Sequence, residues 1–74
     1  MPKLPRVSGR DCAKALQKVG FRFVRMGKGD HMIYRRDEPL AQISIPDHRE
    51  LHSGTLRSII AQAGLAVQEF IDLL

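Results

Sequence analysis

The sequence predicts an α+β domain of two layers, in which helices cover one face of a three-stranded antiparallel sheet. Apolar residues first recur at helical spacing, then alternate over three short stretches, and then return to helical spacing. Short segments rich in glycine, proline and acidic residues join the alternating stretches, which is typical of the turns of an antiparallel meander. Helices that flank such a meander bury its apolar face. We therefore expect residues 1–74 to form a single domain.

The composition is that of a small globular protein. Of 74 residues, 43% are hydrophobic and 27% are charged, which excludes a disordered chain, and the length is close to the minimum for one core. A single cysteine, Cys12, excludes an internal disulfide and a cluster of metal-binding thiolates. No apolar run is long enough for a membrane span or a signal peptide, so we expect a cytoplasmic protein.

The charge is divided unevenly between the two halves of the chain. Residues 1–36 contain ten lysines and arginines against two acidic residues, for a net charge of +8. Residues 37–74 contain two basic residues against six acidic ones, for a net charge of −4. A strongly basic half favours a polyanionic partner, and nucleic acid is the most common of these.

The first predicted helix begins near Ser8 and ends at Gly20. Ser8 is a typical N-cap residue, Asp11 follows at a position that favours a helix start, and glycine is typical of a helix end. One side of this helix is apolar and consists of Cys12, Ala15, Leu16 and Val19. Another side carries three cations four residues apart, here called the basic stripe: Arg10, Lys14 and Lys18. The stripe is either a solvated helix face or a surface that binds phosphates, and the pattern alone leaves both open.

Alternation then predicts strands at residues 21–26, 31–36 and 40–45. The third has an apolar face of Ala41, Ile43 and Ile45 and a polar face of Gln42 and Ser44. The second alternates ambiguously, so the pattern does not predict which of its faces is buried. Two helices follow, over residues 53–63 and 67–74, with Ala66 standing where the last helix would ordinarily have a hydroxyl cap for Glu69.

The first two strands are joined by a basic turn, here called the glycine turn, with the sequence Gly27-Lys28-Gly29-Asp30. Glycine permits the positive φ angles that hairpin turns require. The turn delivers His31 to the start of the second strand, and a histidine titrates near neutral pH. Cations beside it, namely Lys28, Arg25 and Arg35, could neutralise a phosphate.

The predicted order of elements is also that of a double-stranded-RNA-binding domain. Four fragments, in register, resemble the HicA toxins: Ser8 to Phe21, Gly29-Asp30-His31, Ile45-Pro46-Asp47-His48, and Gly54-Thr55-Leu56-Arg57-Ser58-Ile59 followed by Gln62-Ala63-Gly64. The resemblance runs from about Ser8 to the C-terminus, nearly the whole chain.

The resemblance implies a toxin of a toxin–antitoxin pair, with a double-stranded-RNA-binding-like fold. Members of the family cut mRNA independently of the ribosome and are neutralised by a HicB-type antitoxin. For this chain we expect no cofactor. The family's catalytic histidine falls on His31, in the motif with Gly29 and Asp30. Many members have serine in place of Asp30, whose charge would either favour the imidazolium of His31 or hinder a phosphate.

Other interpretations of these residues stay open at the level of sequence. His31 could be an ordinary sheet histidine, and the chain could be an RNA-binding module without catalysis that uses the basic stripe. A third interpretation is an interaction domain whose acidic C-terminal half recruits a protein. His48 and His52 are four residues apart, but the proline and glycine around them favour a loop, so no metal site is predicted.

Overall fold

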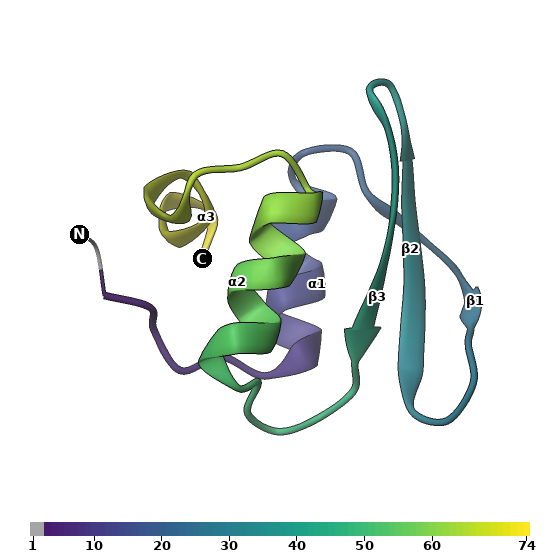
Figure 1. Cartoon of the computed structure of the whole chain (residues 1–74). Coiled ribbons are helices and arrows are strands. Elements are labelled where there is room, and N and C mark those ends of the chain that lie inside the picture. The colour runs from purple at the N-terminus through teal and green to yellow at the C-terminus, as the bar shows by residue number, and fades with distance from the viewer. Residues whose placement is uncertain (1–2) are drawn as a thin grey trace.

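The structure is a computed structural model that describes residues 3–74. It confirms the predicted order of a helix, three antiparallel strands and two further helices (Figure 1). In chain order the elements are α1 (Gly9–Gln17), β1 (Arg22–Met26), β2 (His31–Asp37), β3 (Leu40–Pro46), α2 (Ser53–Gln62) and α3 (Val67–Leu73).

The sheet has the order β1-β2-β3, and both pairs are antiparallel. Met32 and Tyr34 of β2 are buried, as are Ile43 and Ile45 of β3, so these residues face the helices. The alternate residues of β2, beginning with His31, lie on the other face, here called the outer face. The structure thus decides the question that the ambiguous alternation of β2 left open.

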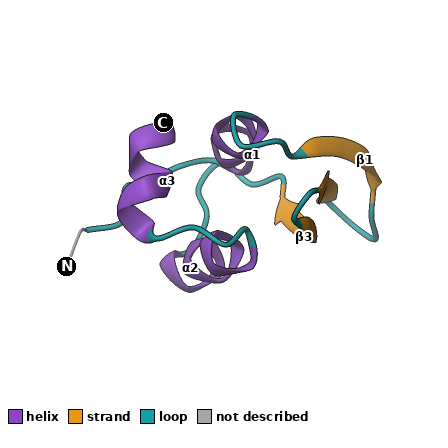
Figure 2. Cartoon of the chain, turned by 90° about the horizontal axis from the view of Figure 1, so that it is seen from above, coloured by secondary structure: helices purple, strands orange, loops and turns teal. Residues whose placement is uncertain are grey.

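The core lies between the inner face of the sheet and the helices. Both α1 and α2 pack on β3, and α3 packs on α1 and α2 at the side away from the strands (Figures 1 and 2). The largest fully buried side chains come from all these elements: Phe70, Leu16, Ile43, Ile45, Leu56, Ile60 and Cys12. The strand β1 extends beyond the helices, and each of its residues is exposed.

The start of α1 is fixed against the end of β3. The Ser8 hydroxyl accepts a hydrogen bond from the N–H of Asp11 at 3.0 Å, which confirms the predicted N-cap. The N–H of Gly9 donates to the carbonyl of His48 at 2.9 Å. A side chain at position 9 would collide with the Pro46 carbonyl oxygen, so only glycine lets the helix come this close.

The last helix retains half of a capping box. The carboxylate of Glu69 accepts a hydrogen bond from the N–H of Ala66 at 2.8 Å, although Ala66 offers no hydroxyl in return. The missing cap therefore leaves one amide of the first turn without its usual side-chain acceptor, and the burial of Phe70 anchors α3. Within residues 3–74, no helix has the length and apolar character needed to cross a membrane.

Candidate functional site

His31 is the first residue of β2, opposite Pro46 of β3, and its side chain is exposed on the outer face of the sheet. Two backbone hydrogen bonds fix the chain around it. The carbonyl of His31 accepts from the N–H of Gly27 at 2.6 Å, and the carbonyl of Asp30 accepts from the N–H of Asp47 at 2.8 Å. The imidazole therefore projects from a position anchored on both sides.

The side chain of His31 has one hydrogen-bond partner in the part of the chain that the structure describes. Its Nδ1 lies 2.8 Å from Oγ of Ser44, a residue of β3 on the same outer face. Among residues 3–74, nothing hydrogen-bonds to Nε2, and the exposure of the ring leaves that atom open to a ligand. The sequence placed Ser44 on the polar face of its strand, but only the register of β2 and β3 brings it to the histidine.

The glycine turn depends on the conformational freedom of Gly29. Gly29 has a φ of +70°, which residues with a side chain rarely adopt. A Cβ at Gly27 would lie 2.9 Å from the Cδ1 atom of Ile33, so a larger residue there would displace the end of the Ile33 side chain. Within the described part of the chain, the side chains of Lys28 and Asp30 form no hydrogen bond or ion pair.

The two arginines predicted beside His31 differ in their contacts. Arg25 lies opposite Ile33 in the β1–β2 register and is exposed. Arg35 donates to the carboxylate of Asp37 at 3.0 Å, and Arg22 donates to the same carboxylate at 2.9 Å. The guanidiniums of Arg22 and Arg35 hold the pKa of the Asp37 carboxyl below its usual value. Of the two, Arg25 is therefore the cation with its charge available to a phosphate.

The basic stripe does not present three equivalent cations. Arg10 binds Asp47 with two hydrogen bonds, of 3.1 and 3.3 Å, and this contact lowers the pKa of the Asp47 carboxyl. Lys18 donates to the carbonyl of Leu73 at 2.7 Å and so ties α1 to α3. Lys14 makes no such bond to another described residue. The stripe also lies on the helix side of the sheet, whereas His31 lies on the outer face.

Asp47 is the residue that the sequence did not single out and the structure makes central. Its carboxylate holds Arg10 of α1, and its N–H holds the carbonyl of Asp30, next to His31. In the sequence it lay in the polar loop after a strand and within one of the four fragments that carry the family resemblance, without a role of its own. Among residues 3–74, no three His, Cys, Asp or Glu side chains are grouped as a metal site would require.

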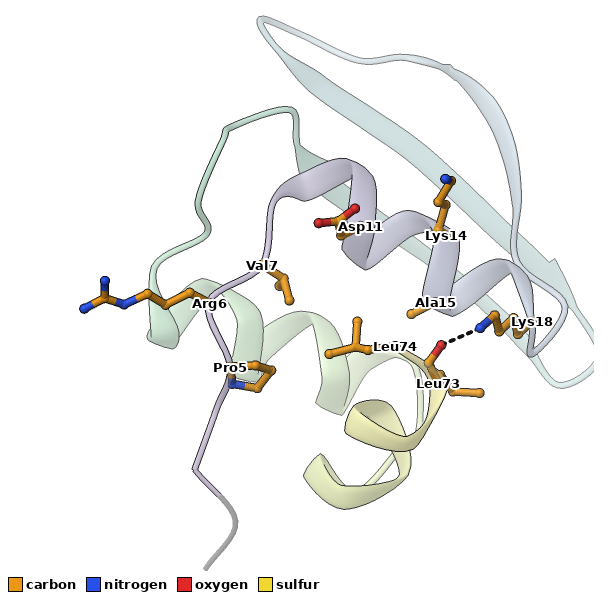
Figure 3. A pocket seen from close by; sticks show the side chains of 9 residues that line it. All are labelled: Pro5, Arg6, Val7, Asp11, Lys14, Ala15, Lys18, Leu73 and Leu74. Carbon is orange, nitrogen blue, oxygen red and sulfur yellow. Dashed lines mark hydrogen bonds between the residues drawn. The ribbon is translucent and has the colours of Figure 1, made fainter.

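A cavity lies elsewhere, between the N-terminal segment, α1 and α3 (Figure 3). It measures about 570 Å³, and Val7, Ala15 and Leu74 point into it while Arg6 and Lys14 point away. His31 does not line it. Its mostly apolar lining offers little to orient a substrate, so His31 and its surroundings stay the candidate site.

The chain also matches a known protein family. The family described as HicA toxin of bacterial toxin-antitoxin matches residues 9–65, which span all of the sheet and the first two helices. No curated protein matches the chain. The protein is therefore a toxin of the kind that works together with an antitoxin. In particular, it belongs to the HicA toxin family.

Proposed function

We propose that this protein is an endoribonuclease that cleaves mRNA, with His31 as its catalytic acid or base. The observation that carries the proposal is the imidazole of His31, which is held through Nδ1 by Ser44 while Nε2 faces solvent beside a basic turn. Membership of a toxin family supports it, because a toxin needs a cellular target and RNA suits the +8 charge of residues 1–36.

RNA supplies its own nucleophile, which keeps the demands on the protein small. The 2′-hydroxyl attacks the adjacent phosphorus, the bond from phosphorus to the 5′-oxygen breaks, and a 2′,3′-cyclic phosphate forms. Nε2 of His31 takes the proton from the 2′-hydroxyl or gives one to the leaving oxygen. Lys28 and Arg25 offset the charge that develops on the phosphate, and Arg35 contributes less because Asp37 shares its charge. Water supplies the other proton transfer.

Ser44 acts in this proposal as a positioning residue. When Nε2 acts as the acid or base, Nδ1 carries a proton in both the neutral and the protonated ring, and Oγ of Ser44 accepts a hydrogen bond from it in both states. A carboxylate in its place would add a negative charge close to the substrate phosphate. Ser44 therefore orients the ring throughout the reaction without repelling RNA.

The same proposal extends to the partners of the protein. A HicB-type antitoxin is the partner expected of a HicA toxin, and mRNA is its substrate. Since mRNA is translated in the cytoplasm, the protein acts there.

Cleavage of a single-stranded RNA by the purified protein, in buffer with a metal chelator, tests the proposal. Wild type should shorten the RNA, and His31→Ala should abolish cleavage while its circular dichroism spectrum is unchanged. His52→Ala is the matched control, because His52 is also exposed and its side chain makes no capping bond. Cleavage that persists in His31→Ala would overturn the assignment. Salt-sensitive RNA binding without any cleavage would favour the non-catalytic module instead.

A further inference from the structure

The strand β1 is an apolar edge that no element of the described chain covers. It is the outermost strand of the sheet, and it extends past the helices that cover β3 (Figures 1 and 2). Three of its five residues are large, apolar and exposed: Phe23 at 49%, Val24 at 42% and Met26 at 50%. Contiguous exposed apolar side chains of this kind mark interaction sites.

A groove of about 320 Å³ runs beside this strand on the helix side of the sheet. Met26, Met32 and Tyr34 line it from the strands, and Arg10, Lys14 and Gln17 line it from α1. The ring of Phe23 packs edge-on against Tyr34, with the centroids 5.7 Å apart. The groove thus has an apolar floor that is already assembled. At its helix side Lys14 is the cation left without a described partner, because Arg10 is paired with Asp47, which also lines the groove.

One of the usual protections of a sheet edge, a proline, is absent from β1. Soluble proteins usually block an edge with proline, with inward-facing charges or with a bulge. In β1 there is an irregularity between Phe23 and Arg25, but no proline interrupts the strand. An exposed edge beside an apolar groove is the arrangement by which a sheet accepts an added strand.

The charges around β1 select among possible occupants. Arg22 and Arg25 lie in the strand itself, so pairing β1 with β1 of a second copy would bring like charges together. An RNA strand would match the charge, but bases stack on flat rings, and Phe23 is the single aromatic residue of β1, with its ring packed edge-on against Tyr34. A protein strand with acidic and apolar residues matches both features.

We infer that β1 and its groove form the docking surface for an acidic strand of the antitoxin, which adds to the edge of the sheet. Its apolar side chains lie over Phe23 and Met26, and its carboxylates face Arg25, since Arg22 is already paired with Asp37. Because β1 runs directly into the glycine turn, a strand bound there stands next to the approach to His31. The inference rests on the proposed pairing with an antitoxin and is independent of the nuclease activity.

Binding of a HicB-type antitoxin, measured by calorimetry with the full-length chain, tests the inference. Met26→Glu and Val24→Glu should each weaken binding at least tenfold. Leu40→Glu is the matched control, since Leu40 is 69% exposed on β3, the opposite edge strand, and its change should leave the affinity as in wild type. Hydrogen exchange should show new protection of β1 amides in the complex.

Activity separates this inference from the proposed function. Met26→Glu should still cleave RNA but should escape inhibition by the antitoxin. Wild-type affinity of both β1 variants for the antitoxin would overturn the inference, whatever the nuclease assay gives. Two other outcomes would also overturn the inference. If Met26→Glu loses RNA binding, β1 binds RNA, and if it disrupts a dimer of the free protein, β1 binds a second copy of the chain.

Discussion

Ser44 and His31 lie on neighbouring strands, two positions out of register, with 2.8 Å between Oγ and Nδ1. The antiparallel pairing of β2 with β3 sets this distance, since it places both side chains on the outer face. The orientation of the ring therefore depends on a sheet that is packed against two helices. A side chain on a loop would not have this support.

Replacing Ser44 by alanine should lower the rate of RNA cleavage about fivefold to tenfold, because a hydrogen bond worth about 1 kcal/mol no longer orients the imidazole. Ser44→Thr keeps the hydroxyl and should restore most of the rate. Gln42→Ala changes an exposed residue of the same strand that alternation places on the same face and should have no effect. Imidazole ¹⁵N shifts of His31 should move in Ser44→Ala only; if all three variants leave them unchanged, Ser44 does not position the ring.

The ion pair of Arg10 with Asp47 should make stability depend on pH in the acid range. Arg10 lowers the pKa of Asp47 in the folded protein, so the pair stabilises the fold above the ordinary value of about 3.9. That stabilisation is lost as the pH falls through the lowered pKa. The urea midpoint of Asp47→Asn should thus lie below that of wild type at pH 7, and the difference should close towards pH 2.

Glu50→Gln is the control for this measurement, since Glu50 is exposed and makes no ion pair with the described residues. Its midpoint should follow wild type at every pH. A constant gap between Asp47→Asn and wild type down to pH 2 would show that the pair contributes through packing and not through charge.

The thiol of Cys12 should be inert in the folded protein. Burial raises the pKa of Cys12 to about 12, so at neutral pH the thiol is protonated as well as inaccessible. Ellman's reagent should label it only after urea is added. Gln17→Cys introduces an exposed thiol on the same helix that should react at once without urea, and equal rates for both thiols in native buffer would contradict this expectation.

Ala66→Ser should stabilise the protein by about 0.5–1 kcal/mol, because it supplies the acceptor missing from the first turn of α3. The bond from the Ala66 N–H to Glu69 already holds the backbone in the required geometry. Denaturant midpoints provide the measurement. Ala61→Ser, at an exposed position inside α2, should be neutral or slightly destabilising, and the same gain from it would remove the capping explanation.

The elements of the fold were predictable because their signals are local. Helix caps such as Ser8, glycines after helices and the change from helical to alternating periodicity lie within a few residues of the boundaries that they set. The apolar faces of α1 and β3 also follow from spacing alone. These features depend on interactions between residues that are close in the sequence.

The contacts of the site were less predictable because they join distant segments. Arg10 and Asp47 are 37 positions apart, and His31 and Ser44 are 13 apart. Each pairing depends on the register of β2 and β3 and on where α1 meets the sheet. Periodicity predicted that Arg10 and Lys18 lie on one side of α1. It could not predict that Arg10 pairs with Asp47 or that Lys18 donates a hydrogen bond to the Leu73 carbonyl.

The contact of Gly9 with the Pro46 carbonyl has a consequence for how this protein can vary. A side chain at position 9 would push the start of α1 off the end of β3. Arg10 would then leave Asp47, whose amide anchors the residue before His31. The position of α1 and the orientation of the His31 ring are thus coupled through Asp47. A substitution that moves the start of α1 away from β3 should therefore also disturb the orientation of the His31 side chain.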